Sequence, residues 1–225
     1  MNNIVLKLKY GFTLAEVLIT LVIIGVIAAM TIPTLINKTQ DQEFKSQFSK
    51  AFSTVSQAIY KTETNDFYGY AKCYYPKPRL DGMEQYYEDD CNNFFNEFLK
   101  NLQVQKICNN NALSGGCVPV YNYTPSGGCS GFSKNRIENT NKTIVLSNGQ
   151  IIIPYNLNGY YYPLFLIDIN GQKGPNAYGK DLFFFQIFRD VDSGMYVGSD
   201  GRCDAPVSGG RTTEEMIKYS LAGIK

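Results

Sequence analysis

The chain has 225 residues, with 21 lysines and arginines against 20 aspartates and glutamates, so its formal net charge is +1. A balance this close to neutral gives no basic patch of the kind that binds nucleic acid, and we expect no nucleic-acid partner. Histidine is absent from the sequence, which removes Ser-His-Asp and Cys-His catalysis and the usual ligands of zinc. We therefore do not expect an enzyme.

The first predicted element is an apolar helix, Val17 to Ile36, which is twenty residues long. At about 1.5 Å per residue it spans roughly 30 Å, the thickness of a bilayer core. Lys7 and Lys9 precede it. By the positive-inside rule these lysines hold the leader in the cytoplasm, so the part of the chain after the helix is predicted to lie outside.

A single carboxylate, Glu16, stands near the start of this apolar helix. The positive end of the helix stabilises it, yet an ionised side chain at bilayer depth costs about 2.5–3.5 kcal/mol on insertion scales. Such a cost indicates a partner for the carboxylate. The alternative is that Glu16 extends to the lipid headgroups without a partner.

Small residues mark possible cleavage sites both before the apolar helix and within it, and the two positions correspond to different processing routes. A secretory signal peptide is cut after its apolar run, and Ala28-Ala29-Met30-Thr31 is only a weak site of that kind. Gly11-Phe12, behind the leader lysines, fits a different route. Residues 11–33, GFTLAEVLITLVIIGVIAAMTIP, resemble the N-terminal segment of type IV pilins and type II secretion pseudopilins. One departure is Ala15, where the family usually has Ile, Val or Leu.

The resemblance implies that prepilin peptidase cuts after Gly11 on the cytoplasmic side and methylates the new amino terminus at Phe12. Glu16 is then the fifth mature residue, and its partner is the amino terminus of a neighbouring subunit. Phe12 and Glu16 together are expected to set the axial stagger of a helical filament.

The same resemblance implies where the protein acts. It places a single-pass subunit in the inner (cytoplasmic) membrane with an extracytoplasmic head, and in a filament after assembly. The implied partners are prepilin peptidase, homologous pilin or pseudopilin subunits and the inner-membrane assembly platform. The filament is a type IV pilus or a type II secretion pseudopilus, and the sequence leaves both open. An alternative from another class is a signal-anchored extracytoplasmic binding domain or enzyme that does not polymerise.

A second helical pattern follows a polar stretch at residues 37–42. Its apolar residues recur at intervals of four, four, three and four, which is one face of an amphipathic helix: Phe44, Phe48, Phe52, Val55 and Ile59. We expect this face to pack on a sheet. The two helices are predicted to form one long rod, bent or loosened at Gly25 and Pro33.

All the cysteines lie beyond the membrane segment, which favours disulfide bonds in an oxidising compartment. Six cysteines allow fifteen complete pairings, and the sequence does not choose among them: Cys73, Cys91, Cys108, Cys117, Cys129 and Cys203. Five of them fall within residues 64–142, which we interpret as a disulfide-tied insertion with one helix near Asp90 to Leu102.

Strand patterns dominate from residue 143 onward. Thr143–Leu146 and Gln150–Pro154 flank Ser147-Asn148-Gly149, a strong hairpin signal. Pro163–Ile169 and Leu182–Phe188 are two further predicted strands. Near the end, Thr212–Ala222 is a short predicted helix, in which Thr213 and Met216 do not make a full capping box.

The predicted fold is therefore α+β, with a long N-terminal helix packed on an antiparallel sheet of about four strands, as in pilins. The expected divisions are a leader at 1–11, a transmembrane half-helix at 12–37, an amphipathic half-helix at 38–63, the cysteine-rich insertion at 64–142 and the sheet region at 143–225.

A polar loop separates the last two predicted strands. Gly174 to Lys180 fits the start of a phosphate-binding loop, but Asp181 replaces the required Ser or Thr and a strand follows, so we reject that interpretation. Four oxygen-bearing residues suit calcium better: Asp168, Asn170, Asn176 and Asp181. The resemblance lends support, since major pseudopilins carry calcium in their C-terminal loops. The alternative is a plain turn built from Asn-Gly and Gly-Pro-Asn.

Overall fold

The structure is a computed structural model that describes residues 11–64, 77–78, 84–85, 88–125, 129–156, 164–190, 194–199, 201, 203 and 205–221. It divides into two compact units, Met1–Glu43 and Phe44–Lys225, which we call the N-terminal unit and the head and describe separately. The leader before Gly11 lies outside the described residues.

Helix α1 runs from Leu14 to Thr64 without interruption. It passes through the polar residues 37–42 and through Pro33, although proline has no N–H to donate within a helix. The prediction of a single long helix is confirmed. In the N-terminal unit its apolar side chains from Val17 to Ile36 are largely exposed, and by length and composition this part is able to cross a membrane.

The head contains a six-stranded antiparallel sheet whose strands follow in chain order. They are β3 (Val104–Cys108), β4 (Thr143–Leu146), β5 (Ile151–Asn156), β6 (Leu164–Asp168), β7 (Leu182–Asp190) and β8 (Gly194–Gly198). Four of them match the predicted strands, and the two at the sheet edges were not predicted. The sheet therefore begins before residue 143, inside the segment that we expected to be an insertion. A separate two-stranded pair joins β1 (Lys77–Pro78) to β2 (Glu84–Gln85).

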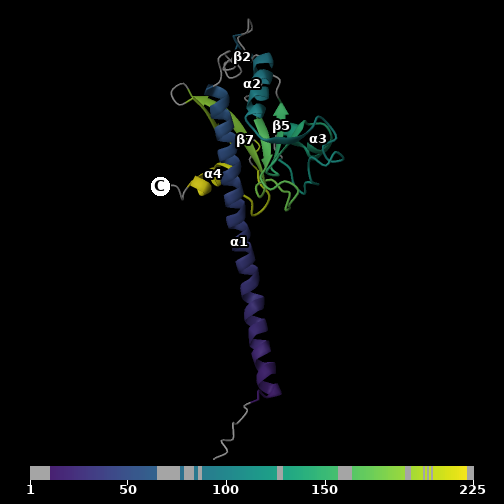
Figure 1. Ribbon diagram of the computed structural model, residues 1–225, viewed down its shortest axis with the longest axis vertical. Coiled ribbons are helices and arrows are strands. Elements are labelled where there is room, and N and C mark those ends of the chain that lie inside the picture. The colour runs from purple at the N-terminus through teal and green to yellow at the C-terminus, as the bar shows by residue number, and fades with distance from the viewer. Residues whose placement is uncertain are drawn as a thin grey trace, which may run out of the picture. The chain divides into compact units, whose positions relative to one another are not determined.

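The C-terminal part of α1 lies against one face of this sheet (Figure 1). Phe48 is fully buried, and its ring meets those of Phe183 and Phe185 edge-on, with centroids 4.9 and 5.6 Å apart. Val55 and Ile59 are buried in the same cluster. The predicted packing of the aromatic stripe on the sheet is confirmed.

The opposite face of the sheet is covered by the cysteine-rich chain around α3 (Lys134–Asn139) and the short 3-10 helix η2 (Ser130–Phe132). Phe132 meets Phe184 at 6.1 Å between ring centroids. Because neighbours along a strand point to opposite faces, Phe183 and Phe185 serve the first cluster and Phe184 the second. A sheet buried on both faces explains why β6 and β7 are almost continuously apolar.

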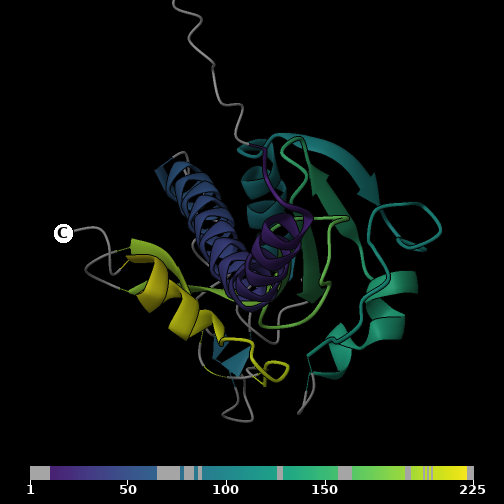
Figure 2. The same cartoon turned by 90° about the horizontal axis from the view of Figure 1, so that it is seen from below.

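Two further helices complete the head. Helix α2 (Glu88–Lys100) lies close to the predicted range and buries Phe94, Phe95 and Phe98 in the first cluster. Helix α4 (Thr213–Leu221) lies on the other side of the head from α3 (Figure 2). Two cations contact the Tyr219 ring, with Lys45 Nζ 4.4 Å and the Arg211 guanidinium 4.5 Å from its centroid. These contacts attach α4 to the head part of α1.

Helix α4 begins with a capping box that lies one residue earlier than the Thr213 position considered in the sequence. Thr212 is the capping residue, and its N–H donates to Glu215 Oε2 at 2.8 Å while the Glu215 N–H donates to Thr212 Oγ1 at 3.1 Å. This is a complete capping box, which the interpretation of Thr213 and Met216 overlooked.

Among the residues that the structure describes, two disulfide bonds join cysteines of the head, which confirms the prediction of disulfides and selects among the pairings. Cys108 at the end of β3 bonds to Cys117, and Cys129 bonds to Cys203 across 74 residues of sequence. Cys73 and the side chain of Cys91 lie outside the described residues.

Candidate processing and assembly site

The residues predicted to be processed and to direct assembly lie at the beginning of α1. Gly11, Phe12 and Thr13 precede the first helical residue, Leu14, and Glu16 lies in the first turn. All are exposed, and Phe12 has 89% of its surface accessible. An accessible chain before a helix is the form in which a peptidase can reach a peptide bond, because a helical bond is already committed to backbone hydrogen bonding.

Glu16 is held by its own helix terminus through Thr13. The Thr13 N–H and Oγ1 donate to Glu16 Oε2 at 2.9 and 2.8 Å, and the Glu16 N–H donates back to Thr13 Oγ1 at 3.2 Å. This reciprocal pair is a capping box that starts α1. It lets the carboxylate satisfy backbone donors that would otherwise face lipid.

The two carboxylate oxygens of Glu16 are in different situations. Both bonds from Thr13 reach Oε2, and no described residue donates to Oε1. The capping box therefore fixes the orientation of the carboxylate and leaves one oxygen available to a donor from outside the helix. Thr13 is a residue of the candidate site that the sequence analysis missed, although the spacing Thr-x-x-Glu before an apolar run carries the signal.

A shallow surface depression lies beside this first turn, lined by Phe12, Glu16, Val17 and Thr20. Glu16 and Thr20 are separated by four positions and share one face of the helix, and Phe12, which precedes the helix, lines the same depression. An aromatic ring, a carboxylate and a hydroxyl thus line one depression on otherwise apolar surface.

The second predicted site, the loop between β6 and β7, is built around two buried aspartates. Asp168 Oδ1 accepts from the N–H groups of Asn170 and Gly171 at 3.2 and 2.7 Å, and Oδ2 accepts from the Tyr121 hydroxyl at 3.0 Å. Burial, and after it the charge of Asp181, raise the pKa of Asp168 well above its ordinary value. The positive φ of Gly171, +68°, turns the chain sharply beneath the hairpin at Gly149.

Asp181 closes the same loop from its other end. Its carboxylate oxygens accept from the N–H groups of Asn176 and Ala177 at 2.6 and 2.7 Å, and burial raises its pKa. The side-chain oxygens of Asn170 and Asn176 are buried and accept no hydrogen bond. The loop thus combines an internal turn network with two unpaired amide oxygens. Within the described residues, no three acidic, cysteine or histidine side chains cluster as metal ligands.

Comparison with known proteins bears on the beginning of α1. No curated protein matches the chain, and no solved structure matches it. A family model, the prokaryotic N-terminal methylation motif, matches residues 6–32, which include Gly11, Phe12, Thr13 and Glu16. This motif marks type IV pilin-like proteins, and together with the apolar part of α1 it supports a prepilin-like, membrane-anchored subunit.

Proposed function

We propose that this protein is cleaved after Gly11, methylated at Phe12 and assembled through α1 into a type IV pilus or a type II secretion pseudopilus. Prepilin peptidase, other pilin-like subunits and the inner-membrane assembly platform are its proposed partners. The match to the methylation motif at residues 6–32 supports processing. It also disfavours the alternative of a signal-anchored binding domain or enzyme that does not polymerise.

The free oxygen of Glu16 is the observation that carries the proposal for assembly. After cleavage, Phe12 bears a new amine, and in lipid a lone ammonium and a lone carboxylate are each costly. Glu16 Oε1 of one subunit is oriented by Thr13 and accepts the amine of the next. The pairing fixes the axial position of one helix against its neighbour, and the exposed apolar surface of α1 supplies the lateral packing.

Three variants separate charge from capping in this proposal. Glu16→Ala removes the charge and the carboxylate half of the capping box, Glu16→Gln keeps an acceptor but removes the charge, and Thr13→Ala removes the hydroxyl half of the box but keeps the charge. We expect all three to insert into the membrane. Both Glu16 variants are expected to be absent from sheared filaments, while Thr13→Ala is incorporated at a reduced level. Normal incorporation of Glu16→Ala would overturn the assembly role.

Mass spectrometry of the mature amino terminus tests processing independently. N-methylated Phe12 is the expected result. An intact leader in protein from native cells would favour the signal-anchored alternative, whatever the assembly assays show.

We further propose that the loop between β6 and β7 binds calcium. The unpaired oxygens of Asn170 and Asn176, with the carboxylates of Asp168 and Asp181, are four ligands of the type that calcium takes, and backbone carbonyls and water supply the remainder of its six to eight. Calcium is expected to raise the melting temperature of the full-length protein relative to a chelator, and Asp181→Asn to abolish the rise. Glu214→Gln, an exposed carboxylate outside the loop, is the control. Equal melting with calcium and with chelator would remove the proposal.

A further inference from the structure

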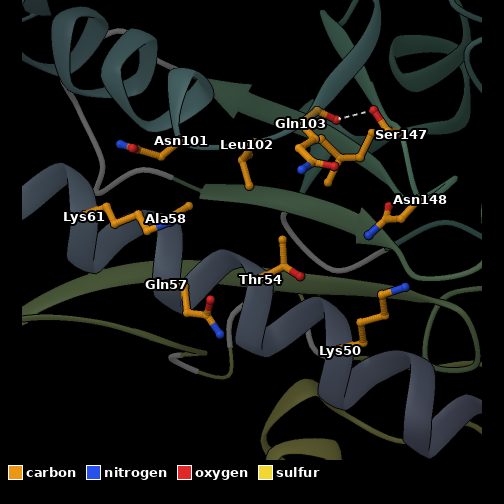
Figure 3. Close-up of a pocket in the computed structure, with 11 residues that line it drawn as sticks. Lys50, Thr54, Gln57, Ala58, Lys61, Asn101, Leu102, Gln103, Ser147 and Asn148 are labelled. Atoms are coloured by element: carbon orange, nitrogen blue, oxygen red, sulfur yellow. Dashed lines mark hydrogen bonds between the residues drawn. The ribbon is translucent and has the colours of Figure 1, made fainter.

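A polar groove in the head lies between the head part of α1, the segment that joins α2 to β3, and the β4–β5 hairpin (Figure 3). Its volume is about 350 Å³, within the range of sites that hold small ligands or a short peptide. Leu102, Leu146 and Ala58 are its buried apolar residues. Around them stand the polar lining residues: Lys50, Thr54, Gln57, Lys61, Asn101, Gln103, Ser147 and Asn148.

Two lysines mark the ends of the groove. Lys50 and Lys61 are separated by eleven positions of α1, which is about 16.5 Å along the axis and within roughly 20° of the same face. Figure 3 shows them at opposite ends of the groove, Lys61 on the side of Asn101 and Lys50 on the side of Asn148. No carboxylate lines the groove, so its electrostatic character is positive.

Several lining groups have no partner among the described residues. Neither lysine forms an ion pair there, and the side chains of Thr54 and Gln103 make no hydrogen bond. The hairpin wall, in contrast, is fixed, because the Ser147 N–H donates to the Gln103 carbonyl at 2.8 Å. The Ser147 hydroxyl donates to the same carbonyl at 3.1 Å (Figure 3). A rigid wall with unused donors opposite it is a preorganised surface for an acceptor-rich ligand.

We propose that this groove binds an acidic segment of a partner protein in an extended conformation. An extended chain rises about 3.3 Å per residue, so five residues span the distance between the two lysines. Two acidic positions about five residues apart pair with Lys50 and Lys61, and the backbone between them bonds the side chains of Thr54 and Gln103. This surface is separate from the beginning of α1 and does not depend on the role proposed for Glu16.

The lining chemistry favours a peptide over the other possible occupants. Single-stranded nucleic acid is bound by aromatic platforms in a strongly basic groove, and no lining residue is aromatic. In a second copy of the head, the surface carboxylates that the structure describes are engaged internally, as Glu97 is with Lys100 and Glu214 with Lys218. Charge complementarity therefore points to a segment from another protein.

The probe is a fluorescein-labelled peptide, Glu-Glu-Gly-Ser-Gly-Ser-Glu-Glu, added to the full-length protein in zwitterionic detergent. Fluorescence anisotropy is expected to rise on binding and to fall with added salt. The double variant Lys50→Gln/Lys61→Gln is expected to weaken binding by roughly tenfold, as two exposed ion pairs do. The matched control, Lys134→Gln/Lys218→Gln, removes two lysines outside the groove and is expected to change affinity by less than about twofold.

A second peptide with all four glutamates at one end tests the spacing, and weaker binding is expected because it reaches only one lysine. Equal binding of both peptides, or equal loss in the control variant, would overturn the proposal in favour of general charge attraction. Binding of a thymidine oligonucleotide but not of the peptide, lost in Lys50→Gln/Lys61→Gln, would assign the groove to nucleic acid instead. Self-association in sedimentation that disappears in the same variant would assign it to a second copy.

Discussion

The N-terminal unit and the head use apolar residues in opposite ways. In the N-terminal unit, Phe12, Ile24 and Met30 expose more than half of their surfaces, whereas Phe48, Phe132 and Phe184 in the head expose none. The head therefore contains its own hydrophobic core, and the N-terminal unit presents an apolar surface of the kind that lipid or a neighbouring subunit covers. We therefore expect substitutions in the head to change stability, and substitutions in the N-terminal unit to change membrane location and assembly.

The sharpest way to test this difference is to truncate one aromatic residue in each unit. Phe48→Ala leaves a cavity beneath Phe183 and Phe185 and is expected to lower the free energy of unfolding of the head by about 3–5 kcal/mol. Phe12→Ala removes an exposed ring and is expected to leave it unchanged. Chemical denaturation followed by circular dichroism measures both. A large destabilisation by Phe12→Ala would contradict the division into a self-sufficient head and a dependent helix.

Removing a disulfide bond is the next change that we expect to lower the free energy of unfolding of the head, which contains both bonds. In the chain-entropy description, a cross-link over 74 residues contributes about 4.5 kcal/mol and one over nine residues about 2.6 kcal/mol. Replacing Cys129 and Cys203 by serine is therefore expected to lower stability more than replacing Cys108 and Cys117. Denaturation of the two double variants under identical conditions gives the order. The reverse order would indicate that packing around Cys117, rather than loop closure, dominates.

The smallest effect compares the two capping boxes, which have the same chemistry in different units. Thr212→Ala is expected to lower the free energy of unfolding by about 1 kcal/mol, because α4 is packed on the head. Thr13→Ala removes the two bonds of the Thr13 hydroxyl at the start of α1 and is expected to leave head unfolding unchanged. Thermal melts of the two variants provide the measurement. Equal losses would show that the start of α1 contributes to head stability.

Most of the fold could be predicted from local patterns in the sequence. The spacing of Phe48 and Val55 predicted the packed face of α1, and the Asn-Gly turn predicted the β4–β5 hairpin. The edge strands were missed for physical reasons. Three of the five residues of β3 are exposed, so it lacks an apolar pattern, and β8 begins and ends with glycine, which weakens any strand signal.

The candidate sites also differ in whether a local sequence pattern marks them. Gly11, Phe12 and Glu16 could be proposed from the sequence because their pattern is contiguous, and the capping partner Thr13 could have been proposed from its spacing to Glu16. The disulfide pairing and the groove between Lys50 and Asn148 depend on which distant segments meet. Contacts between distant segments leave no local pattern. The sequence therefore allowed the N-terminal candidate site to be predicted, but not the disulfide pairing or the groove on the head.

Strand β7 has a consequence for how the sheet finds its alignment. With Phe183, Phe184 and Phe185 in succession, sliding the strand by one residue would still bury aromatic rings on both faces, so hydrophobicity alone gives little preference for one alignment. The preference has to come from polar groups that tolerate no displacement. Asp181 bonds two N–H groups immediately before the strand, and its carbonyl accepts from the Ile169 N–H at 2.9 Å. The buried Asp181 thus fixes the register of β7, and the register determines which phenylalanine faces which side of the sheet.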